Sequence, residues 1–123
     1  CDDNFQFNQP PWSVRGINTY SAYPLIFNKL VRDSNTLSLE EFVQKTSTMP
    51  ARVHNIRNRG TITEGSFADI VLLDVPNVKV LSTELEPRVY PKGIEYVITN
   101  GVVVKEKGQH TGAKPGRVLK RTD

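Results

Sequence analysis

The sequence predicts an α+β chain in which helices precede an antiparallel sheet, and three observations lead to this prediction. Residues 21–33 carry apolar side chains at helical spacing. After Gly60 the apolar segments become short, rich in β-branched residues and separated by Gly, Pro or Asn, as is typical of strands. Asn100-Gly101 stands between two such segments and predicts a tight hairpin. We therefore divide the chain into a helical part, residues 1–59, and a sheet part, residues 60–123.

The helical part opens with a loop and continues with the first helix. Pro10-Pro11 disfavours both a helix and a central strand, so residues 1–19 are predicted to form a loop. The first helix is expected over residues 21–33, with Ser21 as its N-cap and Pro24 in its first turn. Its apolar stripe consists of Ile26, Phe27, Leu30 and Val31.

A second helix is predicted from a capping box. Ser38 is followed three residues later by Glu41, with apolar residues between and beyond. We expect this helix to break before Pro50 and a short further helix to begin with Pro50 in its first turn. The helices are interpreted as the end of a larger helical layer, because the first 33 residues offer the first helix no apolar partner. The alternative is a compact domain in which they pack on the sheet.

Five strands are predicted in the sheet part, at residues 61–63, 68–74, 78–82, 95–99 and 102–106. Asn-Gly readily adopts positive φ at both central positions of a type I′ turn, so Asn100-Gly101 should join strands 94–99 and 102–106. Strict alternation places one apolar set on the core face: Tyr96, Ile98, Val102 and Val104. Asp69, at the start of an apolar strand, is expected to be structural and held by backbone amides.

Composition narrows the classes of partner. The chain is 37% hydrophobic and 24% charged, which is ordinary for a globular domain, and no apolar run reaches the roughly 20 residues that span a bilayer. The single cysteine leaves no internal disulfide framework, and we expect a cytoplasmic protein with no membrane partner. A cluster of basic residues near the C-terminus has no interleaved aromatic residue, so a solvated tail is expected rather than a nucleic-acid site: Lys114, Arg117, Lys120 and Arg121.

The first residue, Cys1, leaves three explanations open. It is a lipidated terminus, an N-terminal nucleophile activated by its own amine, or a cut inside a longer protein. We favour the cut, because the strand-first sheet that an N-terminal nucleophile would need does not follow Cys1. A lipoprotein would leave the rest of the sequence unexplained.

Two long segments carry a resemblance to a known family. The segments "LSLEEFVQKTSTMPARVHNIRNRGTITEGSFADIVLLD" and "GIEYVITNGVVVKEKGQHTGAKPGRVLKR" resemble the C-terminal part of the amidohydrolase superfamily. The ending "GQHTGAKPGRVLKR" is similar to the D-aminoacylase-like branch, the N-acyl-D-amino-acid deacylases. The resemblance covers most of residues 21–121 and keeps the motifs in order.

This resemblance implies a metal-dependent hydrolase made of a (β/α)8 barrel and a small β-sandwich. Residues 1–59 would then hold the terminal loop and helices of the barrel, and residues 60–123 the C-terminal strands of the sandwich. The resemblance implies hydrolysis of the amide bond of an N-acyl-D-amino acid, with zinc as cofactor and most zinc ligands outside this chain. The missing N-terminal part of the enzyme would be the partner, and the chain by itself would be inactive.

Two site residues follow from the resemblance. The family's Ser-Asp pair at the end of the eighth barrel strand matches Cys1-Asp2, with Cys in place of Ser, so Asp2 is the candidate catalytic acid close to the metal. Asp3 is the shifted alternative. Arg15 is the candidate for binding the substrate carboxylate, although "VRGINTYSAYP" lacks the family's His-Pro, and an ungapped match puts Asn18 in the Arg position.

Both histidines are expected to be structural or surface residues. His54 and His110 show no metal-ligand spacing such as H-x-H. Two rival functions stay open: a cyclic-amide hydrolase related to dihydroorotase or hydantoinase, and a non-catalytic interaction module that uses the sandwich and the basic tail.

Overall fold

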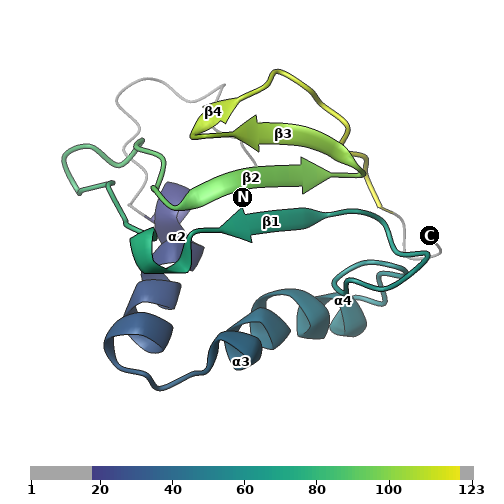
Figure 1. Ribbon diagram of the computed structural model, residues 1–123, viewed down its shortest axis with the longest axis horizontal. Coiled ribbons are helices and arrows are strands. Elements are labelled where there is room, and N and C mark those ends of the chain that lie inside the picture. Colours follow the sequence, from purple (N-terminus) through teal and green to yellow (C-terminus); the bar gives the residue numbers. More distant parts are fainter. Residues whose placement is uncertain (1–17, 120–123) are drawn as a thin grey trace.

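Two helical rods and one antiparallel sheet make up the part of the chain that the computed structural model describes, residues 18–119 (Figure 1). The first rod joins α2 (Asn18–Phe27) to the π-helical segment η1 (Asn28–Asp33). The second rod joins α3 (Leu39–Val43), the π-helical segment η2 (Gln44–Thr48) and α4 (Met49–Val53). No helix within residues 18–119 is long and apolar enough to cross a membrane. The predicted order, helices before strands, is confirmed.

The first rod begins earlier than predicted but ends as predicted, at Asp33. Ser21 is not its N-cap, because α2 starts at Asn18 and Pro24 lies inside the helix. Ser21 is instead fully buried, and its hydroxyl shares a 2.7 Å hydrogen bond with that of Ser82. A polar side chain buried in this way needs a partner, and here the partner comes from a distant loop.

The second rod confirms the capping box. The hydroxyl of Ser38 accepts a hydrogen bond from the Glu41 backbone N–H, and the Glu41 carboxylate accepts one from the Ser38 backbone N–H. The predicted break before Pro50 is wrong, since the chain stays helical through Pro50 to Val53. The predicted short helix is confirmed, because α4 has Pro50 in its first turn. The preceding segment η2 is π-helical, and the Met49 N–H bonds to the carbonyl of Gln44. Its hydrogen bonds reach one residue further back, so the chain stays helical up to the missing amide of Pro50.

The sheet has four strands in the order β1-β2-β3-β4, all pairs antiparallel: β1 (Ile70–Leu73), β2 (Ile94–Thr99), β3 (Val102–Glu106) and β4 (Gln109–His110). The predicted strand at residues 61–63 is a loop. The predicted strand at 78–82 is also absent, apart from a single bridge between Lys79 and Lys92, and the 3-10 turn η3 (Val75–Asn77) precedes it. Short β-branched segments form strands only where a neighbouring strand supplies a run of hydrogen bonds. Among the described residues, segment 78–82 has only the pair of hydrogen bonds at the Lys79–Lys92 bridge, and segment 61–63 has no strand partner.

The hairpin is confirmed, but its predicted faces are partly wrong. Asn100 and Gly101 have φ of +49° and +79°, as a type I′ turn requires, and they join β2 to β3. Thr99 lies opposite Val102, so Ile98 shares its face with Val103 and not with Val102. The register then shifts by one residue, which leaves Val104 as the extra residue of a bulge.

The buried apolar core is small and lies where the two rods meet the loop after η3. It comprises Phe27, Phe42 and Val78, with Val31 packed against them. The rings of Phe27 and Phe42 meet edge to face, with centroids 5.4 Å apart. Arg32 adds a 2.7 Å hydrogen bond to the Val78 carbonyl. This core therefore ties the rods to a loop rather than to the face of the sheet.

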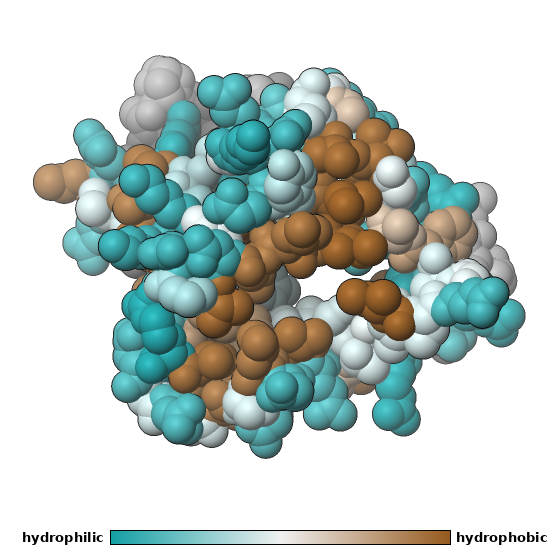
Figure 2. All heavy atoms as spheres, in the orientation of Figure 1, coloured by the Kyte–Doolittle hydropathy of each residue, from teal (hydrophilic) through white to brown (hydrophobic). Residues whose placement is uncertain are grey.

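An open hollow separates the sheet from the second rod. Figure 2 shows hydrophobic side chains on the sheet side and on the helix side of this hollow. In the part of the chain described here, no helix packs broadly on a strand. The sheet and the rods are instead connected beyond the two ends of β1 (Figure 1). The chain from α4 leads into β1 at one end, and at the other end the segment after η3 places Val78 in the core between the rods.

Candidate functional site

The two residues that the resemblance nominates, Asp2 and Arg15, lie outside the described residues, as does the alternative Asp3. Asn18, the other alternative for the carboxylate-binding position, is the first residue of α2. The described residues therefore leave the predicted catalytic positions untested.

The strongest polar constellation of the described residues lies at the connection between the second rod and the sheet. We call Arg59, Phe67, Asp69 and Asn100 the junction cluster. The Arg59 guanidinium forms an ion pair with Asp69 and donates a 2.6 Å hydrogen bond to the Asn100 side-chain oxygen. Only 10% of the Arg59 side chain is exposed, so this charge is largely withdrawn from water and needs both acceptors.

Asp69 and Asn100 complete the junction cluster by binding backbone groups. Asp69 accepts the backbone N–H of Asn100 at 2.8 Å, which confirms that Asp69 is structural. The Asn100 side-chain amide donates to the carbonyl of Pro115, 2.8 Å away, and so holds the C-terminal segment against the hairpin turn. Asn100 was predicted only for its tolerance of positive φ. Its side-chain role follows from distant contacts that a turn motif does not encode.

The ring of Phe67 carries two cations. The guanidinium carbons of Arg59 and Arg117 lie 4.2 Å and 4.8 Å from its centroid. The sequence predicted that Arg117 belongs to a solvated basic tail. In the structure its guanidinium lies over the Phe67 ring, although the residue stays exposed. The junction cluster links the loop after the second rod, the start of β1, the hairpin turn and the C-terminal segment. Its charges are matched internally, which identifies it as a scaffold.

Gly60 brings the second rod and the junction together at close range. Its φ is +81°, and a Cβ on this residue would lie 2.7 Å from the Cβ of Ala51 and 3.0 Å from the carbonyl oxygen of Ser47. The hydroxyl of Thr48 donates to the Gly60 carbonyl at 2.8 Å. Only glycine meets both requirements, positive φ and the absence of a side chain.

The histidines hold surface positions, as predicted. His54 follows α4 as its C-cap residue and is exposed. His110 lies in β4, and its Nδ1 accepts the Gly112 backbone N–H at 2.8 Å. Among residues 18–119 no three His, Cys, Asp or Glu side chains come close enough together to hold a metal ion. The described residues thus do not themselves fit a zinc centre.

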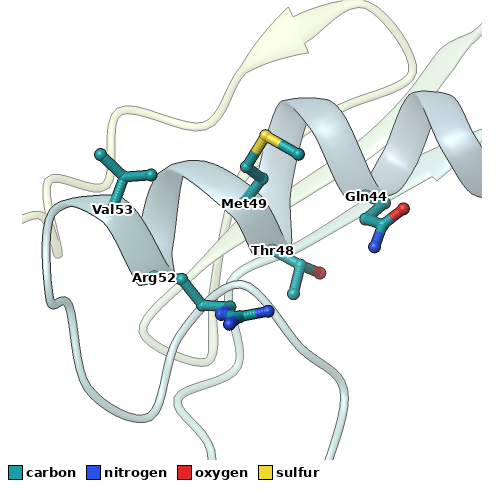
Figure 3. Close-up of a pocket in the computed structure, with 5 residues that line it drawn as sticks. All are labelled: Gln44, Thr48, Met49, Arg52 and Val53. Carbon is teal, nitrogen blue, oxygen red and sulfur yellow. The ribbon is translucent and has the colours of Figure 1, made fainter.

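A shallow pocket of about 360 Å³ lies along the second rod (Figure 3). Its lining comprises Gln44, Thr48, Met49, Arg52 and Val53. In Figure 3 Met49 and Val53 point to one side of the helix, whereas Arg52 and Thr48 point to the other. Arg52 is the single ionisable group of its lining, so the pocket has no general base to activate the Thr48 hydroxyl and does not form an active site.

Comparison with known proteins identifies the family to which this chain belongs. The model of the amidohydrolase family matches residues 9–105, and the chain therefore belongs to the amidohydrolase family. Within that family it is similar to the D-aminoacylase group of deacylases, as the two C-terminal segments predicted.

Two curated relatives illustrate the range of that similarity. The N-acyl-D-glutamate deacylase of Alcaligenes xylosoxydans xylosoxydans is 32% identical over 102 residues, which are 83% of this chain and 21% of the relative. The dihydroorotase of Endomicrobium trichonymphae is 38% identical over 74 residues, 60% of this chain and 17% of the relative. The chain thus spans about a fifth of the length of the curated relatives that it matches.

Two solved structures share its fold. A D-aminoacylase mutant in complex with CuCl2 matches with a TM-score of 0.77 and 32% identity, over 80% of this chain and 21% of that one. The N-acyl-D-glutamate deacylase from Bordetella bronchiseptica, complexed with zinc and a phosphonate inhibitor, matches with a TM-score of 0.63 and 30% identity. That match covers 69% of this chain and 19% of the other.

Proposed function

We propose that this chain is the C-terminal portion of a metal-dependent amidohydrolase that hydrolyses the amide bond of N-acyl-D-amino acids. The observation that carries the proposal is the pattern of similarity. A deacylase matches 83% of this chain, whereas the chain matches only 21% of the deacylase. The described residues are consistent with one part of a larger enzyme. They form a scaffold whose Arg59–Asp69 charges are matched within the chain, and none of their side-chain groups could hold a metal ion.

In this proposal the chain divides near residue 59. Residues 1–59 would be the end of a (β/α)8 barrel, and residues 60–123 would be strands of a β-sandwich. Two observations support the division: the helices end at Val53 before any strand begins, and the rods leave the sheet face uncovered. Helices that packed on the sheet as one compact domain would cover that face.

Asp2 and Arg15 are the proposed contributions of this chain to the active site. Asp2 would lie beside the metal and accept the proton of the attacking water, and Arg15 would bind the substrate carboxylate through its paired N–H donors. Zinc is the proposed metal, as in the deacylase crystallised with zinc, and its remaining ligands would come from outside residues 18–119. When bound, the metal supplies an activated water at neutral pH.

A cyclic-amide hydrolase is the second candidate, because a dihydroorotase matches 60% of this chain at 38% identity. Both candidates open an amide bond, but they differ in the substrate group to be bound. A cyclic amide offers ring carbonyl and N–H groups, whereas an N-acyl amino acid always offers a free α-carboxylate. We favour the deacylase because its similarity extends over more of the chain.

The test is an assay of the natural-length protein on N-acetyl-D-amino acids, with hydantoins and dihydroorotate as the competing substrates. Turnover of the cyclic amides alone would replace the first candidate by the second.

We also propose that the enzyme is cytoplasmic, because its single cysteine suits a reducing compartment.

Asp2→Asn in that protein should lower kcat by about 10²–10⁴-fold, because the amide keeps the shape of the side chain but cannot accept the proton. Asp3→Asn is the matched control and should retain most of the activity. If the two variants exchanged these results, the catalytic acid would be Asp3.

The 123-residue chain alone should show no hydrolase activity and no stoichiometric zinc binding, because one metal-proximal acid cannot make a zinc site. Equilibrium dialysis against zinc, with metal content measured per chain, checks this expectation. One zinc ion bound per chain would contradict it and would require ligands that the chain itself provides.

A further inference from the structure

Asn100-Gly101 is the one place in the sequence where glycine follows asparagine. This pair favours deamidation, because glycine has no side chain to shield its backbone nitrogen. In that reaction the Gly101 nitrogen gives its proton to a solvent base and bonds to the side-chain carbonyl carbon of Asn100, and the side-chain nitrogen leaves as ammonia. Water then opens the resulting cyclic imide to aspartate or isoaspartate. The net reaction consumes one water and releases one ammonia.

The conformation of the hairpin turn holds the two reacting atoms apart. The five-membered imide ring forms only when the Gly101 nitrogen and the Asn100 Cβ lie on the same side of the Asn100 Cα–C bond. Asn100 is left-handed, with φ of +49°, and residues in this region have ψ of about +47°. At that ψ the Gly101 nitrogen lies almost opposite Cβ. Ring closure therefore requires a rotation about the Cα–C bond that takes the turn apart.

Two backbone hydrogen bonds oppose that rotation. The Asn100 N–H donates to the Asp69 carboxylate at 2.8 Å, and the Gly101 N–H donates to the Ala68 carbonyl at 2.9 Å. These bonds fix the backbone on both sides of the Asn100 Cα. The second bond also occupies the N–H whose proton must leave before the nitrogen can attack.

The junction cluster holds the side-chain amide of Asn100 as well. The amide oxygen accepts from Arg59 at 2.6 Å, and the amide nitrogen donates to the Pro115 carbonyl at 2.8 Å. A guanidinium only donates and a carbonyl only accepts, so the amide fits in one orientation. Arg59 is itself held by Asp69 and by the Phe67 ring, and only 10% of its side chain is exposed. Both reacting groups are therefore fixed by contacts from distant parts of the chain.

We propose that Asn100-Gly101 is a deamidation site that the junction cluster keeps closed, and that deamidation after the cluster opens releases the C-terminal segment irreversibly. The product aspartate has no N–H to donate to the Pro115 carbonyl, and its carboxylate faces that oxygen. It also shares Arg59 with a second carboxylate, that of Asp69. Isoaspartate adds a backbone carbon to a two-residue turn and so disturbs the pairing of β2 with β3. Neither step depends on the proposed activity.

The rate of deamidation in the natural-length protein tests the closure. The protein is incubated in mildly alkaline buffer, folded or unfolded in urea, and the modified residues are located by peptide mass spectrometry. Asn100 should deamidate at least about tenfold more slowly in the folded protein, the factor that one net hydrogen bond supplies. Asn35 is the internal control and should be slow in both states, because the β-branched Thr36 follows it. Equal rates at Asn100 in the two states would overturn the proposal.

Arg59→Met opens the junction cluster and should raise the folded-state rate at Asn100 about tenfold. Phe42→Leu, in the apolar core, is the control for a general loss of stability and should leave Asn100 slow at a comparable fall in Tm. Arg59→Lys is the milder variant, with a smaller acceleration, because an ammonium cannot bind both acceptors as the planar guanidinium does. Equal acceleration by the core variant would assign the opening to global unfolding. A slower rate without Arg59 would show that its guanidinium activates the Asn100 carbonyl, and either result would overturn the proposal.

Asn100→Asp reproduces one product directly and tests the release of the C-terminal segment. Trypsin should cleave after Arg117 several times faster in this variant than in the original protein, because the bond to the Pro115 carbonyl is lost. Asn35→Asp is the matched control, since it adds the same charge at an exposed residue that also has positive φ, and its cleavage should stay unchanged. Cleavage of Asn100→Asp at the original rate would overturn the proposed release.

Discussion

The junction cluster adjoins the start of β1 through Asp69, yet it differs from the free edge of that strand in almost every respect. At the start of β1, Arg59 is largely buried and meets acceptors from Asp69 and Asn100, and Gly60 packs against the second rod. Along β1 itself, apolar side chains are exposed and the outward amides are unpaired among the described elements. The side-chain polar groups of the junction cluster are satisfied within the described residues, whereas the apolar side chains of β1 stay exposed.

This difference indicates which contacts the chain completes alone. A self-sufficient domain buries apolar surface first, because that burial is the main favourable term in folding. Among residues 18–119 four apolar residues are buried, and none of them lies in the sheet: Phe27, Phe42, Ala51 and Val78. The junction cluster holds the loop after the second rod against the sheet, and Gly60 in that loop packs on the rod. The uncovered apolar surfaces are those that a larger protein would bury. Substitutions at the junction should therefore be the most damaging.

Gly60→Val should cause the largest loss of stability. The new side chain would overlap Ala51 and the Ser47 carbonyl, and the backbone would be held at positive φ. Overpacking and backbone strain together should cost about 3–5 kcal/mol of unfolding free energy, measured by urea denaturation. Gly65→Val is the matched control, because Gly65 has φ of +82° but open space around it. Equal losses in the two variants would show that the close approach to the rod contributes nothing.

Arg59→Met should have the second largest effect. It leaves the Asp69 carboxylate without its cation and the Asn100 oxygen without its donor, at a cost of about 2–3 kcal/mol, toward the lower end because Asp69 is a third exposed. The C-terminal segment, held through Asn100, should become more sensitive to proteolysis. Arg57→Met, at an exposed position two residues away, is the control and should leave both stability and proteolysis unchanged. If the Arg59→Met variant were as stable as the original chain, the junction cluster would not contribute to the stability of the fold.

The elements that could be predicted from sequence are those whose cause is local. The Ser38 capping box and the Asn100-Gly101 turn depend on residues within a few positions of each other, and both were found where predicted. The N-terminal start of α2 and the continuation through Pro50 were mispredicted because burial of Ser21 against Ser82 and the π-helical turn override local preference. Strand β4 was missed, since a two-residue strand carries no periodicity.

The junction cluster could not be predicted because its members are far apart in sequence. Arg59 and Asn100 are separated by 41 positions, and nothing near either residue indicates the other. Asp69 was predicted to be structural because it stands before an apolar strand. That position indicated its role, but it did not indicate that Arg59 and the Asn100 backbone N–H are its partners. The error in the hairpin faces is different. A two-residue turn pairs Thr99 with Val102, so the faces followed from the turn itself.

The smallest effect is expected for Gly101→Val, and it separates the scaffold from the chemistry most cleanly. Gly101 has φ of +79°, and a Cβ on this residue would meet no atom within 4 Å, so the substitution adds backbone strain without a clash. The cost should be about 1–2 kcal/mol, visible as a lower Tm. Gly101→Asn is the control and should cost less, because Asn tolerates this conformation. In the natural-length enzyme KM should stay nearly unchanged, since the junction cluster and the hairpin contribute no group to the proposed substrate site. A large rise in KM at unchanged Tm would place the hairpin beside the substrate, and the division of this chain into a sheet scaffold and a catalytic N-terminal loop would then be wrong.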